Sequence, residues 1–161
     1  MISVDLKSLI ARLNDTCRKS LEAAAGLTLA RTHYNVEIEH WLQKLCDTTD
    51  TDITAIFNHY GIDMGRFLAD LGRSFELMRT GNARAPGLAP DLVDAMKQAW
   101  LLASIEEAAP RIRSGHLFLA LLSDETLARR MRDISPQLRA LSAEHLRTNL
   151  TRGLYGHTRS K

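Results

Sequence analysis

The sequence contains little of what secreted, membrane-spanning or metal-binding proteins need. Only two of its 161 residues are cysteines, Cys17 and Cys46, and they form no CxxC or Cys/His cluster of the kind that binds zinc. No apolar run approaches the roughly 20 residues of a membrane span. Asp5, Lys7 and Arg12 interrupt the apolar residues near the N-terminus, so a signal peptide is not expected. We therefore expect a cytoplasmic protein.

The charge balance and the motif inventory exclude further classes of function. Lys and Arg number 21 against 19 Asp and Glu, a net charge of +2, and no basic row marks a nucleic-acid-binding face. The GxxxxGK[ST] string that holds nucleotide phosphates is absent, as is the HExxH string of zinc proteases. We expect a binding domain with no catalysis of its own, no cofactor and no metal.

Both cysteines stand in apolar patterns. Cys17 shares a helical register with Leu21 and Ala24, and Cys46 ends the apolar run that begins at Trp41. Because a free cysteine behaves as a small buried hydrophobe, we interpret both as core residues rather than as a disulfide or a reactive thiol.

Helical periodicity runs through almost the whole sequence. Residues that favour helix ends flank the apolar stripes: Asn14, Asp63 and Ser114 as N-caps and Gly61 as a C-cap. No segment alternates as a strand would, so the pattern predicts an all-α protein. The expected helices cover residues 1–13, about 17–31, 37–46, 53–60, 64–78, 92–100, 114–122, 127–134 and 138–150.

The two halves of the chain repeat one pattern. Four residues of the first half recur 75 positions later and four recur 76 positions later: Leu13, Cys17, Leu21 and Ala24 as Leu88, Leu92, Met96 and Ala99, then Val36, His40, Leu42 and Leu45 as Ile112, His116, Phe118 and Leu121. A four-helix unit of roughly 65–75 residues buries its apolar faces poorly alone, so two copies should share one core. We predict one domain over 1–150, comprising an extra helix (1–13), repeat 1 (14–78), a loop (79–90) and repeat 2 (91–150), followed by a polar tail (151–161).

Each repeat carries a histidine four residues after an aliphatic residue. A catalytic histidine needs a nucleophile or carboxylate beside it, and two copies would each need one. We interpret His40 and His116 instead as structural, each bonding a backbone group at the start of an apolar helix. Two pairs of carboxylates are expected to lie on solvated faces: Glu37 with Glu39, and Glu106 with Glu107.

The same residues carry a family resemblance. The stretch LEAAAGLTLARTHYNVEIEHWLQKL (21–45) resembles the first half of a Clp N domain, the double four-helix repeat at the front of Clp/Hsp100 AAA+ unfoldases. Val36, Glu39 and His40 match the motif of that family. In the second copy Ile112 and His116 match, whereas Gly115 stands in place of the Glu. The resemblance covers about 13–150 and implies two pseudo-symmetric four-helix repeats, with the extra N-terminal helix added here.

Four phrases resemble the ClpV branch of this family: the extra helix ISVDLKSLIARLN, EHWL, GNARAP and QAWLLAS. ClpV proteins strip the contracted sheath of type VI secretion by recognising a helical segment of its large subunit, VipB/TssC. The resemblance implies the same partner here, in the bacterial cytoplasm. It also implies C-terminal AAA+ modules that assemble as a hexamer, toward which residues 151–161 would lead.

A helix-in-groove site is the expected binding mode. The stripe Leu6, Leu9, Ile10 and Leu13 would form one wall, the Ala-rich segment with Ala23, Ala24 and Leu27 a second, and Leu88 one end. An amphipathic stripe is usually buried against its own protein, and tight internal packing is an equal alternative for the Ala-rich segment. A few buried anchors, less the cost of association, predict an affinity on the order of micromolar.

Two other functions stay open from the sequence. A general Clp N domain would bind adaptors or unfolded chains through exposed apolar surface. A small all-α enzyme would need a cluster of titratable groups in a cleft.

Overall fold

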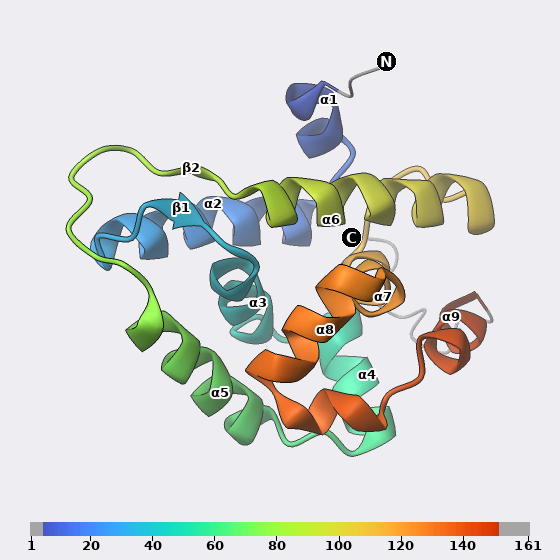
Figure 1. The fold of residues 1–161 in the computed structure, drawn as a ribbon. Coiled ribbons are helices and arrows are strands. Elements are labelled where there is room, and N and C mark those ends of the chain that lie inside the picture. The colour runs from blue at the N-terminus through green and yellow to red at the C-terminus, as the bar shows by residue number, and fades with distance from the viewer. Residues whose placement is uncertain (1–4, 152–161) are drawn as a thin grey trace.

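The computed structural model describes residues 5–151 (Figure 1). Most of this range is helical, and each predicted helix has a counterpart. Residues 1–4 of the predicted extra helix and residues 152–161 of the predicted tail lie outside the described range. The elements are α1 (Leu6–Ala11), α2 (Asp15–Ala30), β1 (Asn35–Val36), α3 (Ile38–Cys46), α4 (Asp52–Tyr60), α5 (Met64–Leu77), β2 (Gly87–Leu88), α6 (Pro90–Leu101), a π-helical turn η1 (Leu102–Glu106), α7 (Ser114–Ser123), α8 (Glu125–Ile134), a 3-10 turn η2 (Pro136–Ala140) and α9 (Ala143–Thr151).

Side chains at the helix ends explain most of these boundaries. The Asn14 side chain accepts a hydrogen bond from the Cys17 amide at 2.9 Å and so caps α2. Asp63 caps α5 in the same way, and Gly61 ends α4 with a left-handed φ of 70°. The prediction for Ser114 is wrong by one position, since the N-cap of α7 is Arg113 and Ser114 is its first helical residue.

The fold is the predicted all-α pair of four-helix repeats with one helix in front. Helices α2 to α5 form the first repeat and α6 to α9 the second. Across the described helices, none has the length and apolar character that a membrane span requires.

Two short parallel bridges join the repeats reciprocally. Val36 of the first repeat pairs with Leu88, which lies just before the second, and Leu13, which lies just before the first, pairs with Ile112 of the second. The hydrogen bonds also correspond: the Ala89 amide donates to the Val36 carbonyl at 3.0 Å, and the Asn14 amide donates to the Ile112 carbonyl at 3.0 Å. In each bridge, the segment that leads into one repeat therefore pairs with a residue inside the other repeat.

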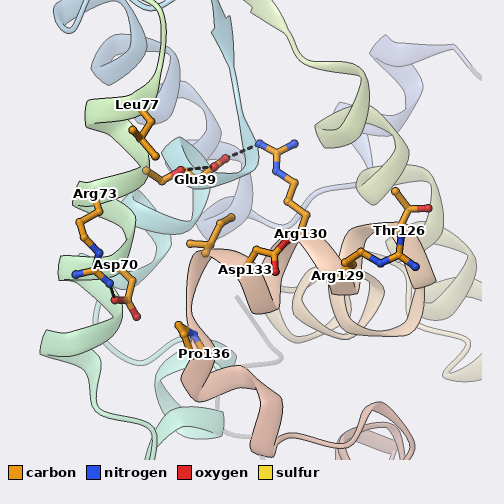
Figure 2. A pocket seen from close by; sticks show the side chains of 11 residues that line it. Glu39, Asp70, Arg73, Leu77, Thr126, Arg129, Arg130, Asp133 and Pro136 are labelled. Carbon is orange, nitrogen blue, oxygen red and sulfur yellow. Dashed lines mark hydrogen bonds and ion pairs between the residues drawn. The ribbon is translucent and has the colours of Figure 1, made fainter.

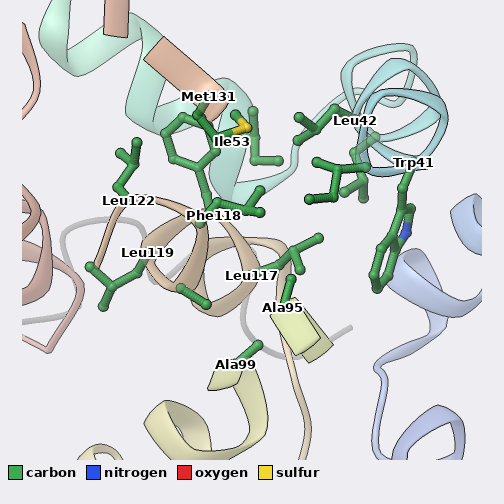
Figure 3. Packing of buried hydrophobic residues seen from close by; sticks show 14 of the residues in the cluster. Trp41, Leu42, Ile53, Ala95, Ala99, Leu117, Phe118, Leu119, Leu122 and Met131 are labelled. Atoms are coloured by element: carbon green, nitrogen blue, oxygen red, sulfur yellow. The ribbon is translucent and has the colours of Figure 1, made fainter. Parts of the chain in front are cut away.

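One apolar core runs through both repeats (Figure 3). The Phe57 ring of the first repeat lies 5.6 Å from the Phe118 ring of the second, edge to face, a favoured arrangement of aromatic rings. Cys17 is fully buried in this core, and Cys46 packs against it. The shared core is the physical reason that two small repeats form one stable unit.

Candidate peptide-binding site

Helix α1 is fastened to the second repeat rather than to the helix that follows it. Leu9 is buried, and α1 packs on α6, above which it lies in Figure 1. The Arg12 guanidinium lies over the Trp100 ring, 4.8 Å from its centroid, a cation–π contact. The Arg111 side chain donates to the carbonyl of Ala11 at the end of α1. These contacts fix the position of α1.

The eight predicted groove residues are not equally accessible. Leu9, Leu13 and Ala24 are buried and can act only by shaping the walls from inside. Leu6 is 36% exposed. Ile10, Leu27 and Leu88 are partly buried, and Ala23 is exposed.

These residues also divide between different parts of the surface. The stripe of α1 faces α6, whereas α2, which carries Ala23 and Leu27, packs on α3 and β1. Ala23 lines a polar depression that it shares with Lys19 of the same helix and Lys44 of α3. Leu88 lies in the β1–β2 bridge. The residues of α1 are thus the best placed of the set to form a wall against α6.

The two repeated histidines brace the turns before their helices. Nδ1 of His40 accepts a 2.9 Å hydrogen bond from the Glu37 amide, and Nδ1 of His116 accepts one of 3.0 Å from the Arg113 amide. A neutral imidazole that accepts at Nδ1 carries its proton at Nε2. His40 Nε2 lies 2.8 Å from Nδ1 of His33, and His116 Nε2 lies 2.8 Å from a carboxylate oxygen of Glu107. Both rings serve as structural braces here.

The His33–His40 pair lies in a setting that favours neutral rings. Burial, aided by the positive charge that His33 would carry, lowers the pKa of His40 to about 4. Burial and then the nearby Arg31 lower the pKa of His33 as well. Two imidazole rings that share a hydrogen bond cannot readily both carry a positive charge, so both rings of this pair are neutral near pH 7.

The repeats differ where the first has Glu39 and the second has Gly115. Glu39 is buried, receives a 2.7 Å bond from Arg130 of α8 and accepts a 2.6 Å bond from the Ser74 hydroxyl. Gly115 instead donates its amide to Asp52 of α4 at 3.0 Å. A Cβ at Gly115 would lie 2.9 Å from the Leu150 side chain, so the second position has no room for Glu.

The predicted solvated face of Glu37 and Glu39 is therefore wrong. Arg130 binds Glu37 at 3.1 Å, Glu39 at 2.7 Å and Asp91 at 2.7 Å, which ties α3 to α6 and α8. Of the second pair, Glu107 is partly buried against His116, and only Glu106 lies exposed. Sequence reasoning missed Arg130 because it is 91 positions from Glu39.

Comparison with known proteins places this fold in a family. The profile described as the Clp repeat (R) N-terminal domain matches residues 12–134. Chaperone protein ClpB from Yersinia enterocolitica is 30% identical over 145 residues, which cover 90% of this chain but only 16% of that protein.

Two solved structures share the fold over nearly the whole chain. The N-domain of ClpV from Vibrio cholerae matches with a TM-score of 0.86 and 25% identity, covering 98% of this chain and 93% of that one. A complex of a ClpV N-domain with a VipB peptide matches with a TM-score of 0.81 and 26% identity, covering 96% and 93%. The chain therefore belongs to the Clp repeat (R) N-terminal domain family.

Proposed function

We propose that this chain is the substrate-recognition domain of a ClpV-type AAA+ unfoldase. It binds a helical segment of the large contractile-sheath subunit, VipB/TssC, for sheath disassembly and recycling in type VI secretion. The observation that carries the proposal is the match over 96% of the chain to a ClpV N-domain in complex with a VipB peptide. The ordered position of α1 on α6 supports it, because it supplies a fixed wall for a partner helix.

The partner helix docks along α1 by the helix-in-groove mode. In this proposal the exposed face of Leu6 and the partly exposed Ile10 contact the partner, while Leu9 and Leu13 hold the wall in place. Ala23, Ala24, Leu27 and Leu88 extend the proposed groove. Each apolar anchor contributes about 1.5–3 kcal/mol before the costs of association, which predicts an affinity on the order of micromolar.

The curated relatives of this chain are much longer than it is. The chain spans 16% of the length of the ClpB relative. We propose that AAA+ modules follow it, that the full-length protein is a hexamer of the bacterial cytoplasm, and that several recognition domains acting together raise the effective affinity. The ATP hydrolysis belongs to those modules, and this domain contributes binding without catalysis.

Fluorescence anisotropy of a labelled N-terminal helix peptide from the cognate VipB/TssC subunit tests the proposal. Saturable micromolar binding that Leu6→Asp weakens at least tenfold supports the α1 groove. Leu77→Asp is the matched control, since Leu77 is an exposed leucine of α5. This design is sharper than deleting residues 1–13, because the deletion would also remove Leu13 from the core. No binding by the unaltered domain overturns the proposal.

The alternative of a general Clp N domain is favoured by one observation. Leu77 and Ile105 are large apolar residues that are 88% and 74% exposed, as a site for unfolded chains requires. A permanently unfolded protein, such as reduced and carboxymethylated lactalbumin, separates the two functions. Binding of that probe as tight as that of the sheath peptide, unchanged by Leu6→Asp, supports the general function.

A further inference from the structure

One turn of the second repeat, residues 107–112, binds the end of α1 and is called the α1-binding turn below. The Arg111 side chain donates to the carbonyl of Ala11, and the Ile112 amide donates to the carbonyl of Arg12 at 2.7 Å. Ala11 is the last residue of α1 and Arg12 is its C-cap. The orientation of α1, the proposed wall of the groove, therefore depends on the shape of this turn.

The first repeat has an equivalent turn, residues 31–36, which binds a loop instead of a helix. The Asn82 amide donates to the carbonyl of Thr32 at 2.9 Å, and the Asn82 side chain donates to the carbonyl of His33 at 3.1 Å. The inter-repeat loop thus takes the place on the first repeat that α1 takes on the second. Contacts that shape the α1-binding turn bear on the groove in a way that their counterparts in the first repeat do not.

Both turns contain a backbone conformation that residues other than glycine rarely adopt. Thr32 has a φ of 58° and Ala108 a φ of 52°. These residues are 76 positions apart, the same offset that separates His40 from His116. A left-handed conformation at a residue with a Cβ persists only where surrounding contacts hold it in place. The contacts that hold Ala108 therefore also hold the position of α1.

Glu107 supplies contacts of this kind, because it joins the beginning of the α1-binding turn to the helix start that follows it. Its carboxylate oxygens lie 2.8 Å from Nε2 of His116 and 3.6 Å from a guanidinium nitrogen of Arg113. The three side chains are 15%, 1% and 8% exposed, and such shielding from water strengthens polar contacts. In the first repeat the neutral ring of His33 takes the corresponding place beside His40. A charged brace is thus a feature of the turn that binds α1.

We propose that Glu107 is a positioning residue for the α1 groove. Its contacts with His116 and Arg113 hold the α1-binding turn, the turn holds α1, and α1 forms the wall that the partner helix contacts. This role rests on the proposed binding of the sheath peptide to α1. Glu107 acts through α1 rather than by touching the peptide, so its loss weakens binding by lowering the fraction of molecules in which α1 is docked on α6.

Fluorescence anisotropy with the labelled sheath peptide, combined with hydrogen exchange of single amides followed by NMR, tests the proposal. In Glu107→Ala the dissociation constant should rise about three- to tenfold, which corresponds to a docked fraction of about 0.1–0.3. Without peptide, the Ile112 amide that bonds the Arg12 carbonyl should exchange at least about tenfold faster, and the amides of α5 should change much less. Glu107→Gln can still accept from His116 and should retain part of the affinity.

Asp70→Asn is the matched control for the loss of a buried carboxylate. Asp70 is buried, pairs with Arg73 and accepts a 2.6 Å hydrogen bond from the Ser135 hydroxyl. It lines a cleft between α5 and α8 (Figure 2), which residues of α1 and of the α1-binding turn do not line. This variant should change neither the affinity for the peptide nor the exchange of the Ile112 amide.

A second variant keeps the test decisive if Glu107→Ala does not fold. Arg111 is exposed, so Arg111→Met removes its contact with the Ala11 carbonyl and leaves the buried contacts of Glu107 in place. It should weaken peptide binding and speed exchange of the Ile112 amide. Arg111→Lys can donate to the same carbonyl and should restore most of the affinity.

Four results separate the role of Glu107 from the proposed function. Unchanged affinity in Glu107→Ala or in Arg111→Met overturns the role of the α1-binding turn alone. Weaker binding without faster exchange of the Ile112 amide overturns it too, because the loss would not act through α1. An equal loss of affinity in Asp70→Asn would assign the effect to general destabilisation and also overturns it. No binding by the unaltered domain overturns the proposed function, and the role of Glu107 with it.

Discussion

The backbone amide of Gly115 donates a 3.0 Å hydrogen bond to the carboxylate of Asp52, across the boundary between the repeats. The same oxygen accepts a 2.9 Å bond from the Arg113 side chain. Asp52 opens α4 in the first repeat, whereas both donors open α7 in the second. The hydrogen bonds of Asp52 thus fix the start of α4 against the start of α7, 63 positions away in the chain.

Replacement of Gly115 by alanine should destabilise the domain. The added Cβ would lie 2.9 Å from the Leu150 side chain and 3.0 Å from the Asp52 carboxylate, and such overpacking typically costs about 1–3 kcal/mol. Urea denaturation followed by circular dichroism measures the loss. Gly72→Ala is the control, since nothing lies within 4 Å of its Cβ position in α5; it should stabilise by about 0.4–1 kcal/mol. Equal stability of Gly115→Ala and the unaltered protein would contradict the steric argument.

Replacement of Arg113 by methionine should cost more than the loss of a surface ion pair. Arg113 and Asp52 are both buried, so the variant leaves a buried carboxylate without its cation, at about 3–5 kcal/mol. Arg18→Met, which breaks an exposed pair with Asp15, should change the free energy of unfolding by less than about 1 kcal/mol. The double variant Asp52→Asn with Arg113→Met should recover part of the loss. A cost for Arg113→Met no larger than that for Arg18→Met counts against the buried pair.

Stability should fall as the pH decreases through the range set by His40. Its pKa in the folded protein is lowered to about 4 from the ordinary 6.5. At a pH between these values the His40 ring is protonated in the unfolded chain and neutral in the folded protein. The contribution of the neutral ring is fully present above pH 6.5 and is lost as the pH falls toward 4. The expected slope is about 1.4 kcal/mol per pH unit for this ring, and His33 acts in the same direction.

Urea melts at a series of pH values measure this slope. His40→Asn removes the titrating ring while its amide oxygen can still accept the Glu37 N–H, so the variant should show a flatter dependence. His59→Asn, at an exposed position of α4, is the control and should keep the original slope. An unchanged slope in His40→Asn would assign the pH dependence to other groups.

The two thiols should be inert while the domain is folded. Burial raises the pKa of the Cys17 thiol far above its usual range and that of the Cys46 thiol to about 12, and only the thiolate reacts rapidly. Labelling with a chromogenic disulfide reagent at pH 8 should therefore proceed through opening of the fold, with Cys46, the less buried of the two, reacting first. In denaturing urea both should react at once. Rapid labelling of Cys17 in the native protein would show that its segment of α2 opens readily.

The local features of the fold could be predicted from the sequence because they depend on neighbours in the chain. A stripe such as Phe67, Leu71 and Phe75 specifies a helix and its buried face, and all three residues are buried. Asn14 and Gly61 mark helix ends by chemistry that acts within one turn. The internal repeat supplied the long-range information, since two copies in register imply a shared core.

Features that depend on distant partners could not be predicted. Glu39 has the charge of a surface residue, and only Arg130 and Ser74 make its burial possible. The stripe of α1 gave no sign of which residues face inward, because the position of α1 is set by distant partners: Trp100 contacts Arg12, Arg111 binds the Ala11 carbonyl, and Ile112 pairs with Leu13. The cleft between α5 and α8 depends on two helices that are close only in the folded chain, and no motif announces it.

The reciprocal bridges have a consequence for the ancestry of the fold. Leu13 pairs with Ile112, and Val36 pairs with Leu88, so each four-helix unit carries both halves of the edge that joins it to its counterpart. A chain with a single unit could pair these edges only with a second copy of itself, as a two-fold homodimer. Size-exclusion chromatography of residues 79–151 alone should accordingly give a dimer if the unit folds. Gene duplication and fusion would convert such a dimer into one polypeptide, whose halves are then free to diverge, as Glu39 and Gly115 have.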